Sequence, residues 1–206
     1  MNRETMKRAW HSFRLLTIQS SGKRADYLRN HHIFYHIGKN CTIVERKVPL
    51  YPRLISLGDN VHLAAKVLMV PHDAIHLCLN NLEQSLREGK RYRERIGCIE
   101  IGDNVFIGSN STVLYNVKIG SKVIIGAGSL VNKDIPDNSV AVGVPARVIG
   151  TFDDFAAKRE KAQMYPEALT PSGHSISQEL ENWCWEQNGR KISGNEETKN
   201  RVSEML

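Results

Sequence analysis

Aliphatic side chains recur at every sixth position between Ile101 and Pro136, and this spacing predicts the fold. Written in sixes, the segment reads IGDNVF, IGSNST, VLYNVK, IGSKVI, IGAGSL and VNKDIP. The first position is always a β-branched aliphatic residue, and the fifth is small or β-branched throughout. This spacing favours extended backbone and is too sparse for an α-helix, which needs an apolar residue every three or four positions. Each hexad therefore predicts one short strand and one turn.

Glycine occupies the second position of four of these six hexads, where we expect it to let the chain turn a corner. Three hexads then make one triangular coil, and successive coils stack as parallel strands about 4.8 Å apart. Weaker hexads begin at Leu57, Leu63 and Met69, and an earlier, broken coil begins at Ile37. The sequence thus predicts a mainly β protein whose core is a parallel β-helix of about four coils.

A long polar segment interrupts the hexads from about residue 73 to residue 99. It contains LNNLEQSLREGKRYRERIG, lacks the hexad pattern and is dense in charge between Lys90 and Arg95. Such a segment has no place inside a narrow coil, so we expect it to project as an arm. Long loops of this kind are often functional.

Both ends of the chain predict helices. Residues 3–30 carry apolar side chains at helical spacing, with a break at Ser20-Ser21-Gly22. After Gly150, TFDDFAAKREKAQ predicts a helix with Thr151 as its N-cap, and SQELENWCWEQN predicts a second. We therefore divide the chain into a helical segment (1–32), a β-helix domain with the arm (33–150), and C-terminal helices with a polar tail (151–206).

The composition excludes some classes of protein but does not indicate a function. The chain has 206 residues, of which 41% are apolar and 24% charged, as in an ordinary soluble protein. It has no apolar run long enough to span a membrane and no apolar signal core, so we expect a cytoplasmic protein. The net charge of +6 is spread along the chain, so a phosphate-bearing cofactor or a solvated surface explains it as well as nucleic acid does, and we expect no nucleic-acid partner. The four cysteines form no CxxC pair, which argues against a disulfide framework or a structural zinc site.

His72 is the most informative candidate for chemistry, because it stands where the hexads give way to the arm. A histidine on a rigid strand end suits general-base work, since its unperturbed pKa lies near neutrality. A surface histidine at a turn is the plain alternative. His72 and His76 supply only two metal ligands, and His62 is the one further candidate nearby, so we expect no metal.

Lys133 and Arg147 lie just beyond the last regular coil, where two cations can hold a phosphate or can simply be solvated. Cys78 has no neighbouring base that would make it a nucleophile. Trp10, Trp183 and Trp185 fall on predicted helices, where we expect them to pack rather than to form a ligand platform.

The stretch IGDNVFIGSNSTVLYNVKIGSKVIIGAGSLVNKDIPDNSVAVGVPARVIG resembles the hexapeptide-repeat acyltransferases. Within them it is most similar to the branch of sugar and capsular-polysaccharide O-acetyltransferases. The resemblance is strong from Ile101 to Gly150 and extends loosely back to Ile37, including VPHD. It implies a left-handed parallel β-helix, a homotrimer, and acetyl-coenzyme A bound between neighbouring subunits with the arm helping to close the cleft.

The resemblance also implies roles for single residues. His72, in VPHD, matches the catalytic general base. The cofactor positions that carry over are Ser109, Ala127, Asn132, Lys133 and Arg147. Three positions depart from the family pattern: Asn132 where threonine is frequent, Gly150 where some relatives have a second arginine, and Phe106 where tryptophan is common. The acceptor-binding residues of the family find no match around Asn40–Thr42.

The resemblance leads to an acetyl-coenzyme A-dependent O-acetyltransferase acting on a saccharide hydroxyl. Four alternatives stay open: an N-acetyltransferase acting on an amino or nucleotide sugar, an antibiotic acetyltransferase, a γ-class carbonic anhydrase-like zinc enzyme, and a non-catalytic scaffold. The sequence does not identify the acceptor or the group that orients His72.

Overall fold

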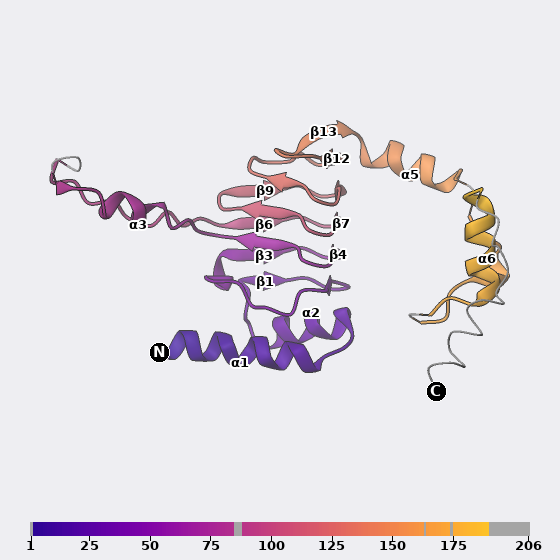
Figure 1. The fold of residues 1–206 in the computed structure, drawn as a ribbon, viewed down its shortest axis with the longest axis horizontal. Helices are drawn as coiled ribbons and strands as arrows, with labels where there is room; N and C mark the ends of the chain where they lie inside the picture. The colour runs from indigo at the N-terminus through magenta and orange to yellow at the C-terminus, as the bar shows by residue number, and fades with distance from the viewer. Residues whose placement is uncertain (1, 85–87, 163, 174, 190–206) are drawn as a thin grey trace, which may run out of the picture. The chain divides into compact units, whose positions relative to one another are not determined.

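Short parallel strands stack into three sheets, which form the three sides of a left-handed parallel β-helix (Figure 1). The computed structural model describes residues 2–84, 88–162, 164–173 and 175–189. One sheet has the order β1 (His36–Ile37), β3 (Ile55–Leu57), β6 (Ile99–Ile101), β9 (Val117–Ile119). The second, from its far edge, has β2 (Thr42–Ile43), β4 (Val61–Leu63), β7 (Val105–Ile107), β10 (Val123–Ile125), β12 (Ser139–Val142), and the antiparallel β13 (Arg147–Gly150). The third has β5 (Leu68–Val70), β8 (Thr112–Leu114), β11 (Leu130–Val131).

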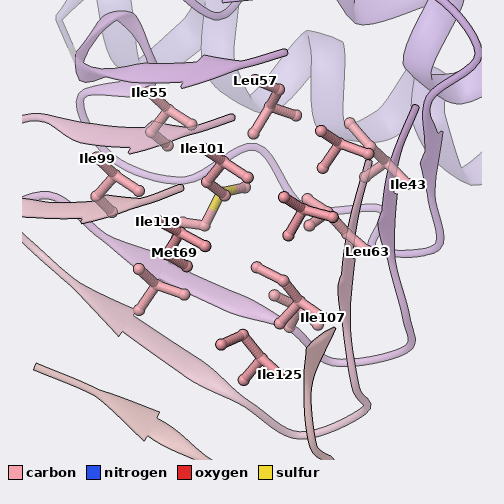
Figure 2. Packing of buried hydrophobic residues seen from close by; sticks show 14 of the residues in the cluster. Ile43, Ile55, Leu57, Leu63, Met69, Ile99, Ile101, Ile107, Ile119 and Ile125 are labelled. Carbon is pink, nitrogen blue, oxygen red and sulfur yellow. The ribbon is translucent and has the colours of Figure 1, made fainter. Parts of the chain in front are cut away.

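The first and fifth residues of each hexad fill the interior of the β-helix. Figure 2 shows first-position residues, among them Ile101, Ile107 and Ile119, in this core. The six first-position residues are at most 4% exposed, and the six fifth-position residues at most 5%. Each large aliphatic residue buried in this way contributes roughly 1.5–3 kcal/mol to folding. Ser111 and Ser129 are buried among them, and both hydroxyls donate to the Gly126 carbonyl, at 3.1 and 2.6 Å. The predicted fold class is confirmed.

The second-position glycines do not turn the corners, so that part of the prediction is wrong. The left-handed backbone falls instead on the fourth position of the hexads, at Asn104, Asn110, Asn116, Lys122 and Gly128. The second-position glycines are needed for space, because a Cβ there would strike the next coil. At Gly102, for example, it would lie 2.9 Å from the Gly120 carbonyl carbon. Asparagine tolerates left-handed backbone better than most residues, which explains its place at the corners.

The arm leaves the β-helix between β5 and β6 and contains the short helix α3 (Ile75–Asn80) (Figure 1). Its two limbs pair with each other. The Gly97 amide donates to the Pro71 carbonyl, and the Asp73 amide to the Arg95 carbonyl, both at 2.9 Å. Further out, the Asn80 side chain bonds both the amide and the carbonyl of Tyr92. The arm is therefore a paired ribbon, as far as its described residues extend.

Two helices, α1 (Arg3–Thr17) and α2 (Ser21–Asn30), precede the first coil. Ser20 caps α2, accepting from the Lys23 amide at 3.4 Å. Helix α2 packs against β1 and β2 and buries Ala25 and Leu28. The buried Arg24 donates to the carbonyls of Ile18, Gln19 and Ile43, which ties the helix pair to the first coil. Trp10 on α1 is 59% exposed, so the expectation that it packs is wrong within this chain.

The chain divides into two compact units, Met1–Ala157 and Lys158–Leu206. Helix α5 (Phe152–Glu160) follows β13, and Thr151 caps it by accepting from the Asp154 amide at 3.1 Å. In the second unit, Ser177 caps α6 (Gln178–Gln187), whose Leu180 is buried. Trp183 packs edge-on against Tyr165, whereas Trp185 is 40% exposed. The predicted polar tail, residues 193–206, lies outside the described residues. None of the described helices combines the length and apolar character needed to cross a bilayer.

Candidate active site

The backbone of His72 is held at the root of the arm. Strand β5 ends at Val70, and the buried Pro71 follows. His72 then forms an isolated antiparallel bridge with Ile96 on the returning limb. Because hydrogen bonds flank this bridge on both sides, His72 stands on fixed backbone where the β-helix opens into the arm.

Tyr51 packs against the His72 ring. The two ring centroids are 5.4 Å apart, and the planes meet at 84°, so one ring presents its edge to the other. Tyr51 has left-handed backbone (φ 52°) directly before the 3-10 turn η1 (Pro52–Leu54). Its hydroxyl donates to Glu94 Oε2 on the returning limb at 2.9 Å. This hydrogen bond, together with some burial, raises the pKa of Tyr51. Tyr51 thus connects the link between the first two coils to the arm and fixes one side of His72.

The Nδ1 atom of His72 is buried and has no hydrogen-bond partner among the described residues. The same holds for Nδ1 of His76 on α3. His62 does not converge with them, because it lies on β4 in another sheet and bonds Thr42 and Asn60, each at 2.9 Å. Within the described chain, no three histidine, cysteine or acidic side chains gather as metal ligands.

A cavity of about 470 Å³ reaches His72 from the side of the first coil. Apolar side chains make up most of its wall, among them Leu50, Leu68 and Val70. Its polar side chains besides His72 are Arg8, Glu45 and Lys47, carried by α1 and by the segment after β2. His72 is therefore one of the residues that border a space large enough for a small molecule.

Asp73 turns away from the His72 ring, as its neighbouring position in an extended segment predicts. Its carboxylate accepts from the Tyr115 hydroxyl at 2.9 Å and from the Ile75 amide at 3.3 Å. Burial opposes its ionisation, but the hydrogen bonds from Tyr115 and from the backbone outweigh this effect and lower the pKa of Asp73. Asp73 thus fastens the arm to the next coil rather than orienting His72.

Three cofactor candidates share one corner of the β-helix. Ser109 and Ala127 follow β7 and β10 in consecutive coils, and the Gly128 amide donates to the Ser109 carbonyl at 2.8 Å. A Cβ on Gly108 would lie 2.4 Å from the Ala127 amide nitrogen, so this corner is tightly stacked. Arg147 begins β13 opposite Val142, at the end of the strand next to β10. It is exposed, and so is Ala127.

The other two cofactor candidates share the corner of His72. Asn132 and Lys133 directly follow β11, are exposed, and lie at the same end of the third sheet as His72, which follows β5. Strands β5 and β11 are separated by β8, so the two positions are about 10 Å apart along the stack. The six predicted site residues therefore form two groups at opposite ends of the β5–β8–β11 sheet.

Sequence reasoning missed Tyr51 and Glu94, which lie 43 positions apart. Neither belongs to a hexad, since Tyr51 lies in the irregular link before the second coil and Glu94 in the arm. The only sequence signal near Tyr51 is the turn-forming proline that follows it. That signal indicates a turn, but not which way the ring points.

Comparison with known proteins agrees with this architecture. Residues 98–133 match the family model for the bacterial transferase hexapeptide (six repeats). The putative acetyltransferase YvoF of Bacillus subtilis is 30% identical over 128 residues, which cover 61% of this chain and 66% of the relative. The galactoside O-acetyltransferase of Escherichia coli is 38% identical over 120 residues, which cover 58% of this chain and 55% of the relative.

Among solved structures, a galactoside acetyltransferase in complex with coenzyme A aligns at 25% identity and a TM-score of 0.49, covering 84% of this chain and 92% of that chain. The chain spans between about half and two thirds of the length of the two curated relatives above. The matched repeat is the segment whose hexads fill the coils from β6 to β11. The chain belongs to the hexapeptide-repeat acyltransferase family.

Proposed function

We propose that this protein is an acetyl-coenzyme A-dependent O-acetyltransferase that acts on a saccharide hydroxyl, with His72 as its general base. The observation that carries the proposal is the setting of His72. This residue stands at a fixed strand end and is among those that line a cavity of about 470 Å³, and its buried Nδ1 has no partner among the described residues. The names of the relatives, which include galactoside O-acetyltransferases, support the acetyl transfer and the sugar acceptor.

In the proposed reaction, acetyl-coenzyme A supplies the acetyl group as an activated thioester. The neutral imidazole of His72 takes the proton of the acceptor hydroxyl while that oxygen attacks the thioester carbonyl. The imidazolium then returns the proton to the leaving thiol. A general base of this kind contributes about 10²–10⁴ in rate. Tyr51 keeps the ring at one angle to the cavity, because its own hydroxyl is held by Glu94.

The residues at the two corners suit a thin, phosphate-bearing co-substrate. Ala127 is exposed and lies against Gly108 of the preceding coil, so two residues with little or no side chain border that edge. Lys133 and Arg147 are exposed, and neither forms an ion pair with another described residue. Both cations are thus available for phosphate groups, while Ser109 and Asn132 can offer polar contacts.

The division of these residues between two ends of one sheet favours a site completed by a neighbouring copy. We therefore include a homotrimer in the proposal, with the corner of Ser109, Ala127 and Arg147 on one subunit facing His72 of another. Sedimentation equilibrium of the full chain tests this part, since a monomer at assay concentration with full activity would contradict it.

The test of the function is release of free coenzyme A thiol from acetyl-coenzyme A in the presence of galactosides, maltose and amino sugars. We expect acceptor-dependent release with a hydroxyl acceptor, and a loss of at least about a hundredfold in His72→Ala. His36→Ala, which changes an exposed histidine on β1, is the matched control and should retain full activity.

The acceptor panel separates the related activities. A preference for an amino sugar over its hydroxyl counterpart would replace O-acetyl transfer by N-acetyl transfer. Failure to bind coenzyme A at millimolar concentration, with the fold intact, would favour a scaffold. Full activity of His72→Ala would remove the general-base role while leaving the family assignment untouched.

A further inference from the structure

Helix α1 exposes a row of large apolar side chains to solvent. Four large side chains on this helix are more than half exposed: Met6 at 55%, Trp10 at 59%, Phe13 at 57% and Leu16 at 58%. Their spacing of four, three and three places them on one face of the helix. The buried residue of α1 is Leu15, which points to the other side. The described residues therefore leave most of this face open, and Phe13 and Leu16 at its border also line the groove beside residues 45–48.

A row of basic side chains runs beside this apolar face. At 100° per residue, Arg3, Lys7 and Arg14 fall together on the flank next to Trp10. Lys7 pairs with Glu4 at 3.1 Å, whereas Arg3 and Arg14 form no ion pair with any described residue. Apolar side chains including tryptophan, bordered by arginine and lysine, are typical of a helix that lies in the surface of an anionic bilayer.

Contacts with the rest of the chain hold α1 in this orientation. The Arg46 guanidinium donates to the Leu16 carbonyl at 2.7 Å, and the Val48 amide donates to the Ser12 hydroxyl at 3.0 Å. On the inner side, His11 Nδ1 lies 2.8 Å from the Tyr27 hydroxyl. The helix cannot rotate its apolar face inward without breaking these bonds. Its exposed side chains are thus fixed in place before any partner arrives, which lowers the entropic cost of docking.

A lipid surface explains both parts of the face better than a second copy of the chain. Exposed apolar patches of this kind mark interaction sites. If two copies paired antiparallel through these faces, their basic rows would lie on the same side of the pair, and like charges in contact weaken an interface. In the proposed homotrimer the face would meet a different surface of the neighbouring copy, and the oligomeric state of the variants separates that case. An anionic bilayer meets the apolar residues with its acyl region and the basic row with its headgroups.

We propose that α1 docks this protein on an anionic membrane surface, with Met6, Trp10, Phe13 and Leu16 inserted at the interface and Arg3, Lys7 and Arg14 on the headgroups. The groove between α1 and residues 45–48, of about 520 Å³, shares Arg8, Glu45, Lys47 and Val48 with the cavity that His72 lines. Docking would therefore bring residues 45–48, which border both the groove and that cavity, near the bilayer. The docking itself does not rest on the proposed acetyl transfer.

Co-sedimentation of the full chain with vesicles tests the proposal. We expect binding to phosphatidylcholine vesicles that contain phosphatidylserine, weak binding to phosphatidylcholine alone, and weaker binding as salt rises.

The double change Trp10→Ser with Phe13→Ser should lower the partition coefficient by roughly tenfold or more. Arg3→Gln with Arg14→Gln should lower it only on the anionic vesicles. Ile176→Ser, which removes an apolar residue 57% exposed on the second unit, is the matched control and should bind as the parent does.

Tryptophan fluorescence gives a second readout that is independent of sedimentation. With Trp183 and Trp185 changed to phenylalanine, Trp10 is the sole tryptophan of the chain, which has three. Its emission should shift to the blue on anionic vesicles and not on neutral ones. Absence of vesicle binding would overturn the proposal. So would binding that the Trp10/Phe13 change leaves intact, or a change in oligomeric state of that variant without any vesicle binding, which would assign the face to contacts between copies.

Discussion

Residues 99–135 and residues 71–97 adjoin in the chain but are built by opposite rules. In the regular coils, the first and fifth residues of every hexad are at most 5% exposed. In the arm, Ile75, Leu77 and Ile96 are each more than half exposed. The coils therefore bury their apolar side chains in a core, whereas the arm leaves these three exposed. The arm is held by hydrogen bonds at its root, which is where His72 lies. The hexad residues therefore account for stability, and His72 at the root of the arm accounts for the proposed chemistry.

The largest effect on stability is expected from the core of the coils. Ile119 is fully buried on β9, so Ile119→Ala removes packing on several sides and should lower the free energy of unfolding by about 2–5 kcal/mol. Ile96→Ala in the arm is the matched change, since Ile96 is 56% exposed, and it should be nearly neutral. Urea unfolding of both variants measures the difference. Equal losses of unfolding free energy in the two variants would show that the arm contributes to stability as the coils do.

A smaller loss is expected where coils stack on glycine. In Gly108→Ala, the new Cβ would meet the Ala127 backbone at 2.4–2.7 Å, and such overpacking costs about 1–3 kcal/mol. Gly22→Ala on α2 is the control, because its Cβ would meet only Ser20 Oγ at 3.8 Å, and better helix propensity should stabilise it slightly. Thermal unfolding compares the two. A neutral Gly108→Ala would show that the hexad glycines do not serve close stacking.

Next in size is the contact between Tyr51 and Glu94. Tyr51→Phe keeps the ring against His72 but removes the hydroxyl that bonds Glu94. A net hydrogen bond contributes about 0.5–1.5 kcal/mol to stability, so the melting temperature should fall by only a few degrees. Because the bond also holds the ring that packs on His72, we expect kcat to fall roughly two- to tenfold. Combined with Glu94→Ala in a double-mutant cycle, the second change should add little to the first. Fully additive losses would mean that the two residues do not act as a pair.

The smallest effect concerns the bond between Tyr115 and Asp73, and it depends on pH. The pKa of Asp73 is lowered below its ordinary value of 3.8, because the folded state favours the carboxylate. The bond therefore stabilises the fold above pH 3.8, and this contribution disappears as the pH falls through the lower, folded-state value. The stability gap between the parent and Tyr115→Phe should be constant near neutrality and should close in strong acid. A gap that widens on acidification would contradict the assigned partner.

The coils could be predicted from the sequence because their rule is local. Six-residue spacing alone identifies Ile101, Val105 and their repeats as interior, and Thr151 was recognisable as a cap from the acidic turn after it. The same spacing did not reveal why Gly102 is glycine, because a tight turn and a close contact between coils both require glycine. That distinction appears only when coils are stacked.

The surroundings of His72 could not be predicted, because they depend on segments without a repeat. Tyr51 and Glu94 meet only after the link between coils and the arm have both folded. Helix α1 was predictable as a helix, but its apolar spacing did not show that Trp10 faces away from the protein. The roles of His72 and of the five cofactor positions come from family resemblance and stay predictions.

The most direct test of the account measures stability and activity on one preparation of His72→Ala. His72 is outside the hexad core, so its melting temperature should stay within a few degrees of the parent. Its rate of acceptor-dependent thiol release should fall by at least about a hundredfold. A variant that melts normally and retains its activity, or one whose activity falls only as far as it unfolds, would contradict the claim that the arm root carries the chemistry.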